Sequence, residues 1–144
     1  MKLTMKDCIF CKMINGEINI KKIYEDEETL AFLDLAPASP KGGHILVIPK
    51  KHYKLIYEMS QEDSNAIMET IKKVSKAILN WSEGLNVLQN NGHVSGQAVF
   101  HAHFHLIPRF ENDGIEIEKW SPRNYKDGEM TKIQQQIKTL LKES

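Results

Sequence analysis

The spacing of hydrophobic residues changes along the chain and predicts where strands and helices lie. Short apolar stretches bounded by turn residues predict five strands, over 22–25, 29–35, 43–49, 85–90 and 99–107. Apolar residues at helical spacing predict helices over 8–14, from Ser60 to Gly84, and over about 129–142. The strands cluster in sequence and the helices are segregated from them, which predicts an antiparallel α+β domain and not a βαβ array.

The helix that starts at Ser60 has the clearest sequence signals. The Ser60 hydroxyl can cap the first turn, and Glu62 and Asp63 suit the positive end of a helix dipole. Apolar side chains then recur at helical spacing, at Ile67, Ile71, Val74, Ile78 and Trp81. Gly84 is expected to end the helix.

Length and charge limit the kinds of protein that this chain can be. Its 144 residues suit one domain with a sizeable core, so 1–144 is interpreted as a single domain. The formal net charge is zero, and the one dense basic stretch, 50–54, is interpreted as a solvated loop, so neither nucleic acid nor a membrane is an expected partner. No stretch has the length of a bilayer span or the apolar centre of a signal peptide, so a cytoplasmic location is expected.

Three histidines alternate in the last predicted strand. His101, His103 and His105 would point to one face, while the apolar residues between them would point to the other. Such a row is difficult to explain by packing alone. A single zinc ion held by all three is also disfavoured, because residues i and i+4 of a strand lie about 13 Å apart. The row therefore predicts groups with separate roles along an extended substrate.

Imidazole chemistry suggests what such a row can do. Neutral imidazole is a good nucleophile near neutral pH, and it becomes a good leaving group once it is bound to phosphorus and positively polarised. The chain has neither a Gly-x-Gly-x-x-Gly motif nor a Gly-Lys-Ser/Thr motif, so Rossmann and P-loop phosphate sites are excluded. We therefore expect nucleotidyl transfer without a catalytic metal, through a covalent intermediate.

Two cysteines, Cys8 and Cys11, form a Cys-x-x-Cys pair near the start of the chain. In a reducing compartment this spacing is typical of half of a zinc site or of a redox motif, and a disulfide is less expected. A redox pair normally opens a helix of a thioredoxin-like fold, which this chain does not resemble. Two distant histidines would complete a tetrahedral zinc site.

The segment from Gly96 to Arg109, GQAVFHAHFHLIPR, resembles the G-Q-x-V-x-H-x-H-x-H-x-x-P-R signature of the histidine triad family. Three other segments agree in order and spacing: CIFC at 8–11, AFLD at 31–34 and GHILVIPKKH at 43–52. The resemblance covers a core over about 7–110 and leaves a tail and helix over 111–144. It implies a five-stranded antiparallel fold with one long helix and one or two shorter ones. It also implies a homodimer, with the long helix and a central strand at the interface.

The resemblance also implies roles for individual residues. His103 would be the nucleophile, His105 would contact the α-phosphate, and Asp34 would accept both ribose hydroxyls. His44 would lie behind the triad, and Gln97 would lie near the scissile bond. The other nucleotide contacts would be the apolar purine cleft of Ile9, Phe10, Ile18, Phe32 and Leu35 and the phosphate loop of Asn90, Gly96, Gln97 and Ala98. One branch of the family, of bacterial type, holds a structural zinc. The resemblance implies that its ligands match Cys8, Cys11, His52 and His101.

Three functions remain open on the sequence alone. The leading hypothesis is an enzyme that cleaves dinucleoside polyphosphates, nucleoside phosphoramidates or aminoacyl adenylates at the α-phosphate and releases a nucleoside monophosphate. Pro108 and Arg109, with the loop before the triad, favour a dinucleoside polyphosphate, and Arg109 would serve a second phosphate or simply close a strand. The alternatives are a nucleotide-binding regulator with little turnover and a zinc-dependent hydrolase.

Overall fold

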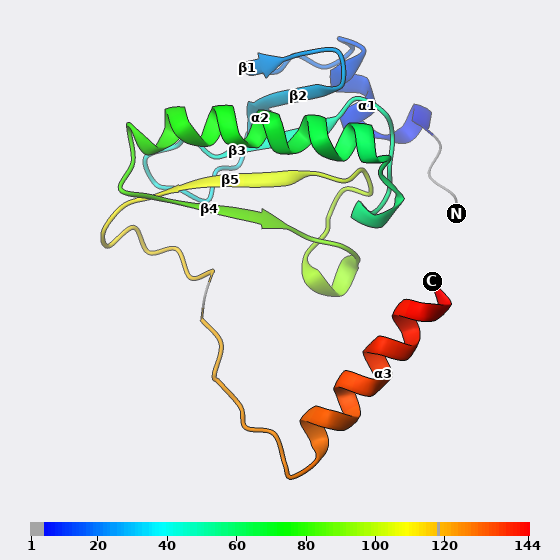
Figure 1. The fold of residues 1–144 in the computed structure, drawn as a ribbon. Coiled ribbons are helices and arrows are strands. Elements are labelled where there is room, and N and C mark those ends of the chain that lie inside the picture. The colour runs from blue at the N-terminus through cyan, green and yellow to red at the C-terminus, as the bar shows by residue number, and fades with distance from the viewer. Residues whose placement is uncertain (1–4, 118) are drawn as a thin grey trace.

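A computed structural model of the chain describes residues 5–117 and 119–144. Its strands form one five-stranded antiparallel sheet in the order β1-β2-β3-β5-β4, as Figure 1 shows. The strands are β1 (Lys22–Glu25), β2 (Thr29–Leu33), β3 (Ile45–Pro49), β4 (Gly84–Gln89) and β5 (Phe104–Arg109). The α-helices are α1 (Ile9–Ile14), α2 (Gln61–Leu79) and α3 (Glu129–Glu143). Three short 3-10 turns lie at Met5–Asp7, Ile56–Glu58 and His93–Ser95. The predicted α+β class and the five strands are confirmed.

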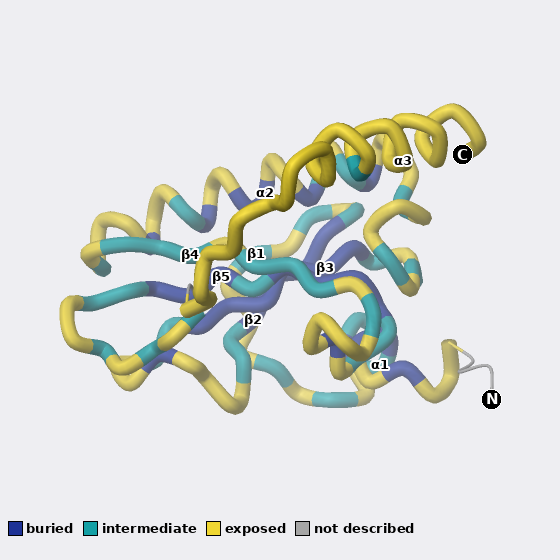
Figure 2. The backbone as a smooth tube through the Cα atoms, turned by 90° about the horizontal axis from the view of Figure 1, so that it is seen from below, coloured by how far each residue is buried: buried dark blue, intermediate teal, exposed yellow. Residues whose placement is uncertain are grey.

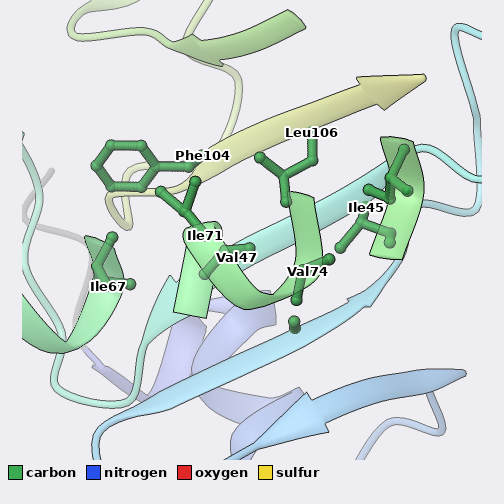
Figure 3. Close-up of a cluster of buried hydrophobic side chains, with 9 residues drawn as sticks. Ile45, Val47, Ile67, Ile71, Val74, Phe104 and Leu106 are labelled. Carbon is green, nitrogen blue, oxygen red and sulfur yellow. The ribbon is translucent and has the colours of Figure 1, made fainter. Parts of the chain in front are cut away.

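Helix α2 covers one face of the sheet and builds the main core. Its buried stripe of Ile67, Ile71, Val74 and Ile78 is the one that the sequence predicted, and the Ser60 hydroxyl accepts from the Asp63 amide as expected. Apolar residues from three strands meet this stripe: Ala31, Ile45, Val47, Phe104 and Leu106 (Figure 3). Burial of this apolar surface is the main force that holds the helix to the sheet.

The opposite face of the sheet packs against α1 and the N-terminal segment, so the sheet is covered on both sides (Figure 2). Alternation along the strands sorts the side chains: Leu30, Phe32, Leu46 and Ile48 join Phe10 and Met13 of α1 in a second cluster. His105 pairs with Leu46 in the register of β3 and β5, and its neighbours Phe104 and Leu106 face α2. The histidine therefore lies on the α1 face of the sheet.

The last predicted strand is shorter than expected, and this changes the interpretation of the triad. Strand β5 begins at Phe104, so His101 and His103 precede the strand and His105 alone of the three lies within it. The Ala102 amide bonds to the Tyr53 carbonyl instead of to a strand partner. The predicted strand bounds are therefore wrong, but the three histidines still share the α1 face, because His101 and His103 both pack against Phe10 and His103 packs against His105. His101 is held by the distant Pro49 carbonyl, and His103 is held by the nearby His101 carbonyl.

The long helix also ends earlier than predicted. It stops at Leu79, with Asn80 as its C-cap, and Gly84 opens β4 instead of ending the helix. Trp81 lies beyond the helix, and its ring packs edge-on against Phe110 with centroids 5.2 Å apart. The prediction that the helix continues through Trp81 is therefore wrong.

After β5 the chain leaves the body of the domain and ends in α3, which stands apart from the sheet (Figure 1). None of the side chains of α3 is buried. The helix was expected at about 129–142 and is present at Glu129–Glu143. In the described part of the chain, no helix is long and apolar enough to cross a membrane.

Candidate functional site

A cleft of about 260 Å³ opens on the α1 face of the sheet, next to the histidines. One wall comes from Ile9 and Phe10 of α1, and the other comes from Phe32, Asp34 and Leu35 at the end of β2. His103 and His105 close one side of the cleft together with Ala98. The cleft therefore brings together an apolar slot, a carboxylate and two imidazoles, which suits a base, a ribose and a phosphate in that order.

Four residues that the sequence assigned to nucleotide binding do not line this cleft: Ile18, Asn90, Gly96 and Gln97. Ile18 packs against the second core cluster, and Ile20 lines the cleft instead. The sequence analysis also missed Met13, Leu33, Leu46 and Val99 as lining residues. Their apolar character marked them only as core, because a residue of a sheet face looks the same whether a helix or a ligand covers it.

The Gln97 side chain is buried and makes three hydrogen bonds to the backbone. Its carbonyl oxygen accepts from the Gly92 amide at 2.7 Å, and its amide nitrogen donates to the carbonyls of Lys54 and Val99 at 2.9 and 3.2 Å. These bonds tie the 3-10 turn at His93–Ser95 to the segment after β3. Gln97 is thus placed to fix the shape of the loop before the triad, and both protons of its side-chain amide are already donated to backbone carbonyls.

The hydrogen bond of His103 fixes which of its ring nitrogens is protonated. Nδ1 lies 2.7 Å from the carbonyl oxygen of His101. A carbonyl can only accept, so Nδ1 carries the proton and Nε2 keeps its lone pair. The ring also packs edge-on against Phe10, with centroids 5.1 Å apart. An oriented imidazole with a free Nε2 lone pair at a cleft is what nucleophilic attack requires.

A second chain of hydrogen bonds fixes the tautomer of His105. The Ala38 amide donates to Nδ1 of His44 at 3.0 Å, so the His44 proton lies on Nε2. That nitrogen is 2.9 Å from Nδ1 of His105, which must accept, and the His105 proton therefore lies on its own Nε2. His105 is thereby a hydrogen-bond donor beside the nucleophile, and the ring centroids of His103 and His105 are 5.0 Å apart.

Asp34 lies close to this chain of hydrogen bonds but does not form a hydrogen bond with His44. Its Oδ2 is 3.7 Å from Nε2 of His44, too far for a hydrogen bond, and its Oδ1 accepts from the Ala36 amide. The ligand atoms of Asp34, His44 and His105 lie within 4.8 Å of one another, which is also compatible with a metal ion. The direct hydrogen bond between the two histidines accounts for their closeness without one.

Burial keeps the histidines neutral. It lowers the pKa of His103, while the His101 carbonyl and the charge of Asp34 act in the opposite direction. Burial also lowers the pKa of His105 to about 4, with smaller contributions from His103 and His44 in the same direction and an opposing one from Asp34. Both rings are therefore neutral near pH 7, with one donor nitrogen and one acceptor nitrogen each.

The first triad histidine faces a different set of residues. His101 is fully buried, and its Nε2 lies 2.8 Å from the Pro49 carbonyl, so that Nδ1 keeps a lone pair. This Nδ1 is 3.5 Å from Sγ of Cys8 and 3.6 Å from Sγ of Cys11. Nδ1 of His52 lies 3.3 Å from Sγ of Cys11. The four residues that the sequence assigned to zinc therefore converge, with all ligand atoms within 4.8 Å of one another.

These separations fit a tetrahedral zinc ion. Bonds of about 2.3 Å to sulfur and 2.0–2.1 Å to nitrogen place the sulfur and nitrogen ligands about 3.5–3.6 Å apart. Burial and the neighbouring Cys8 raise the pKa of the Cys11 thiol to about 12, so a thiolate at this position requires a bound cation. Two buried sulfurs, the Nδ1 lone pair of His101 and the imidazole of His52 form the donor set that zinc prefers.

Arg109 does not reach the cleft. Its guanidinium donates to Asp113 at 2.9 Å, to Oδ1 of Asn86 at 2.6 Å and to the Ile115 carbonyl at 3.0 Å. These bonds fasten the first residues after β5 to β4. Of the two roles considered from the sequence, closing a strand describes this arginine and binding a second phosphate does not.

Comparison with known proteins identifies the family. The family model of the HIT domain matches residues 15–112, and the chain belongs to this family, whose name refers to the histidine triad. An uncharacterized HIT-like protein of Methanocaldococcus jannaschii is 46% identical over 118 residues, which is 81% of this chain and 90% of the relative. The adenosine 5'-monophosphoramidase hnt1 of Schizosaccharomyces pombe is 50% identical over 102 residues, or 71% of this chain and 74% of that protein.

Solved structures agree on the fold. The crystal structure of a HIT family member from Bacillus subtilis superposes with a TM-score of 0.84 at 40% identity, covering 92% of this chain and 96% of that one. Because the coverage exceeds the span of the family model, the likeness extends into the tail beyond residue 112.

The neutral state of His105 has a measurable consequence. Its imidazole should titrate with a midpoint near 4 in the folded protein, while histidines in the urea-unfolded chain titrate near the ordinary value of about 6.5. The unfolded chain then binds more protons between these two values, so this histidine makes the protein less stable as the pH falls from about 6.5 to 4. NMR titration of the histidine Cε1–H signals checks this prediction, and a His105 midpoint at or above 6 would contradict it.

Proposed function

We propose that the protein is a nucleotide hydrolase or nucleotidyl transferase that acts at the α-phosphate through a covalent nucleotidyl-histidine intermediate on His103. The observation that carries the proposal is the His103 ring beside the cleft, with Nδ1–H bound to a backbone carbonyl and an Nε2 lone pair left for attack. The apolar walls of the cleft would hold a purine, and Asp34 at its rim would accept the ribose hydroxyls.

The reaction would proceed in two displacements. In the first, Nε2 of His103 bonds to the α-phosphorus, and the bond from phosphorus to the leaving oxygen or nitrogen breaks, with its electron pair going to the leaving group. A leaving nitrogen takes a proton from solvent and departs as an amine. The positive charge that develops on the imidazole is stabilised by the bond from Nδ1–H to the His101 carbonyl. In the second, water or another acceptor attacks phosphorus and releases its proton to solvent, the phosphorus–nitrogen bond breaks with its electron pair returning to Nε2, and His103 is restored. With water as acceptor, the product is a nucleoside monophosphate.

His105 would stabilise the charge on the phosphoryl oxygens. The chain of hydrogen bonds from Ala38 through His44 leaves a proton on Nε2 of His105. A neutral donor in this position can bond to a non-bridging oxygen that gains negative charge in the transition state. His44 would act as a positioning residue, because it contacts His105 and does not line the cleft.

The names of characterized relatives support this reaction class. The relative from Schizosaccharomyces pombe is named an adenosine 5'-monophosphoramidase, and 71% of this chain aligns with it. A phosphoramidate has a phosphorus–nitrogen bond at the α-phosphate, which is the bond type that the first displacement breaks. Dinucleoside polyphosphates and aminoacyl adenylates would react at the same phosphorus with a different leaving group.

The nucleophile can be tested by trapping the intermediate. His103→Ala should abolish both turnover of an adenosine phosphoramidate and the adenylate adduct seen by mass spectrometry, because no other ring has its lone pair at the same point. The loss in kcat should be about a thousandfold or more. His93→Ala is a matched control, since this histidine is exposed on a 3-10 turn outside the cleft. If the unmodified protein binds AMP but never forms the adduct, the chain is a nucleotide-binding regulator instead.

We propose further that Cys8, Cys11, His52 and His101 hold a structural zinc ion. The support is the tetrahedral fit of their separations and the tautomer of His101. All four positions of a tetrahedral ion would be filled by the protein, so the metal would leave no open position for substrate. The ion would hold α1 against the segment that carries His103. A thiolate site of this kind suits a reducing compartment, and we propose a cytoplasmic location on that basis.

Removal of the metal should therefore destabilise the fold, because the metal supports the structure and does not act in the reaction. The purified protein should contain about one zinc per chain by elemental analysis, and Cys11→Ser should lose the metal and lower the Tm by about 10 °C or more. Activity should decline only as the protein unfolds. Rapid loss of turnover on chelation at a temperature where circular dichroism is unchanged would favour a zinc-dependent hydrolase.

We also propose that the protein is a homodimer. The apolar side chains Met130, Ile137, Leu140 and Leu141 of α3 are all more than half exposed, although they recur at helical spacing on one side of the helix. An isolated helix of 15 residues is marginal in water without a packing partner.

Light scattering should give twice the chain mass of 16.6 kDa, and Ile137→Asp should shift the equilibrium towards monomer while Gln135→Asp should not. A monomer at micromolar concentration would contradict this proposal.

A further inference from the structure

A second hollow, of about 600 Å³, lies beside the cysteine and histidine cluster and shares no lining residue with the nucleotide cleft. Cys11 and His52 form part of its lining, and four lysines surround it: Lys6, Lys12, Lys50 and Lys51. The lysines come from two segments of the chain, one near the N-terminus and one at the end of β3. Within the described residues, Glu17 is the single carboxylate that lines the hollow.

The ion pairs divide the four lysines into two kinds. Lys50 pairs with Glu25 at 3.0 Å and Lys51 with Asp63 at 3.6 Å. Lys6 and Lys12 have no ion pair among the residues that the structure describes. Zinc bound by two thiolates and two neutral imidazoles would add no net formal charge to the lining of the hollow. Lys6 and Lys12 therefore outnumber Glu17, and the hollow keeps a net positive charge that favours an anion.

A smaller hollow of about 200 Å³ connects this basic site with the nucleotide cleft. It shares Ile9, Ala98 and Val99 with the cleft, and it shares His52 with the basic hollow. The three hollows are therefore adjacent, and the smaller one is lined also by Asp7, Cys8 and Phe100. A ligand bound at His103 would reach the lysines by way of this smaller hollow.

We propose that the basic hollow binds the phosphate chain of the leaving half of a dinucleoside polyphosphate, with Lys6 and Lys12 as its charged contacts. This inference rests on the proposed function, because it assigns a place to the leaving group of the same reaction. A polyphosphate released from the α-phosphorus carries several negative charges, and Lys is a common phosphate contact in proteins. The apolar residues Met5 and Ile14 also line the hollow and offer a surface for the distal nucleoside.

The basic stretch 50–54, interpreted from the sequence as a solvated loop, is thus only part of this site. The sequence could not show that Lys6 and Lys12 lie opposite it, because that depends on how α1 packs against the end of β3. The site also makes Arg109 unnecessary as a contact for a second phosphate, which agrees with its bonds to Asp113 and Asn86.

Direct binding separates this proposal from the proposed function. The full zinc-loaded protein is saturated with AMP to fill the cleft and is then titrated with inorganic tripolyphosphate by calorimetry. The unmodified protein should bind, and the double variant Lys6→Gln/Lys12→Gln should bind about tenfold or more weakly. The control Lys126→Gln/Lys132→Gln makes the same change in net charge on the exposed tail and should bind as the unmodified protein does. Absence of binding, or equal weakening in both double variants, overturns the proposal.

Turnover gives the second readout. The Lys6→Gln/Lys12→Gln variant should lose about tenfold in kcat/KM for diadenosine tetraphosphate and less than about twofold for adenosine phosphoramidate, whose leaving group is small and uncharged. If the double variant loses kcat/KM by the same factor for both substrates, or loses none for either while the unmodified protein turns them over, the proposal is overturned. If neither substrate is turned over by any protein, the proposed function fails, while the tripolyphosphate titration still decides whether the basic hollow binds phosphate chains.

Discussion

The hydrogen bond from Nδ1 of His103 to the carbonyl oxygen of His101 determines what the rest of the site can do. It fixes the proton on one ring nitrogen and leaves the other with a lone pair, and it would also stabilise the charge that develops on attack. Two further backbone groups act in the same way. The Pro49 carbonyl sets the tautomer of His101, and the Ala38 amide sets that of His44 and, through it, of His105.

Backbone control of this kind requires a backbone that is itself held in place. The sheet is packed on both faces, with α2 on one and α1 on the other, so the strand ends that carry Pro49 and Phe104 have little freedom. Gln97 ties down the loop before the triad through three hydrogen bonds. A zinc ion at the cysteine pair would complete the support by fixing His101, whose carbonyl orients the nucleophile. The proposed metal would therefore affect catalysis through position alone.

Much of the fold could be predicted because its signals are local. Alternation gave the strands to within a few residues, and the Ser60 cap with the apolar stripe of α2 located the long helix. The convergence of Cys8 and Cys11 with His52 and His101 followed from resemblance, since no local pattern joins residues more than 40 positions apart. The strand interpretation of the triad failed because alternation alone cannot distinguish a strand from an extended segment whose amides bond elsewhere, as that of Ala102 does. The roles of Gln97 and Arg109 depend on tertiary hydrogen bonds, so they could not be predicted from the sequence.

The tautomer of His103 is the most direct test of this account. Long-range nitrogen–proton NMR correlation on the uniformly ¹⁵N-labelled zinc-loaded protein at neutral pH distinguishes a protonated ring nitrogen from one with a free lone pair. The account predicts that Nδ1 of His103 is protonated and that Nε2 is not, with the opposite assignment for His105. A His103 ring protonated on Nε2, or on both nitrogens, would leave no lone pair for attack and would contradict the mechanism.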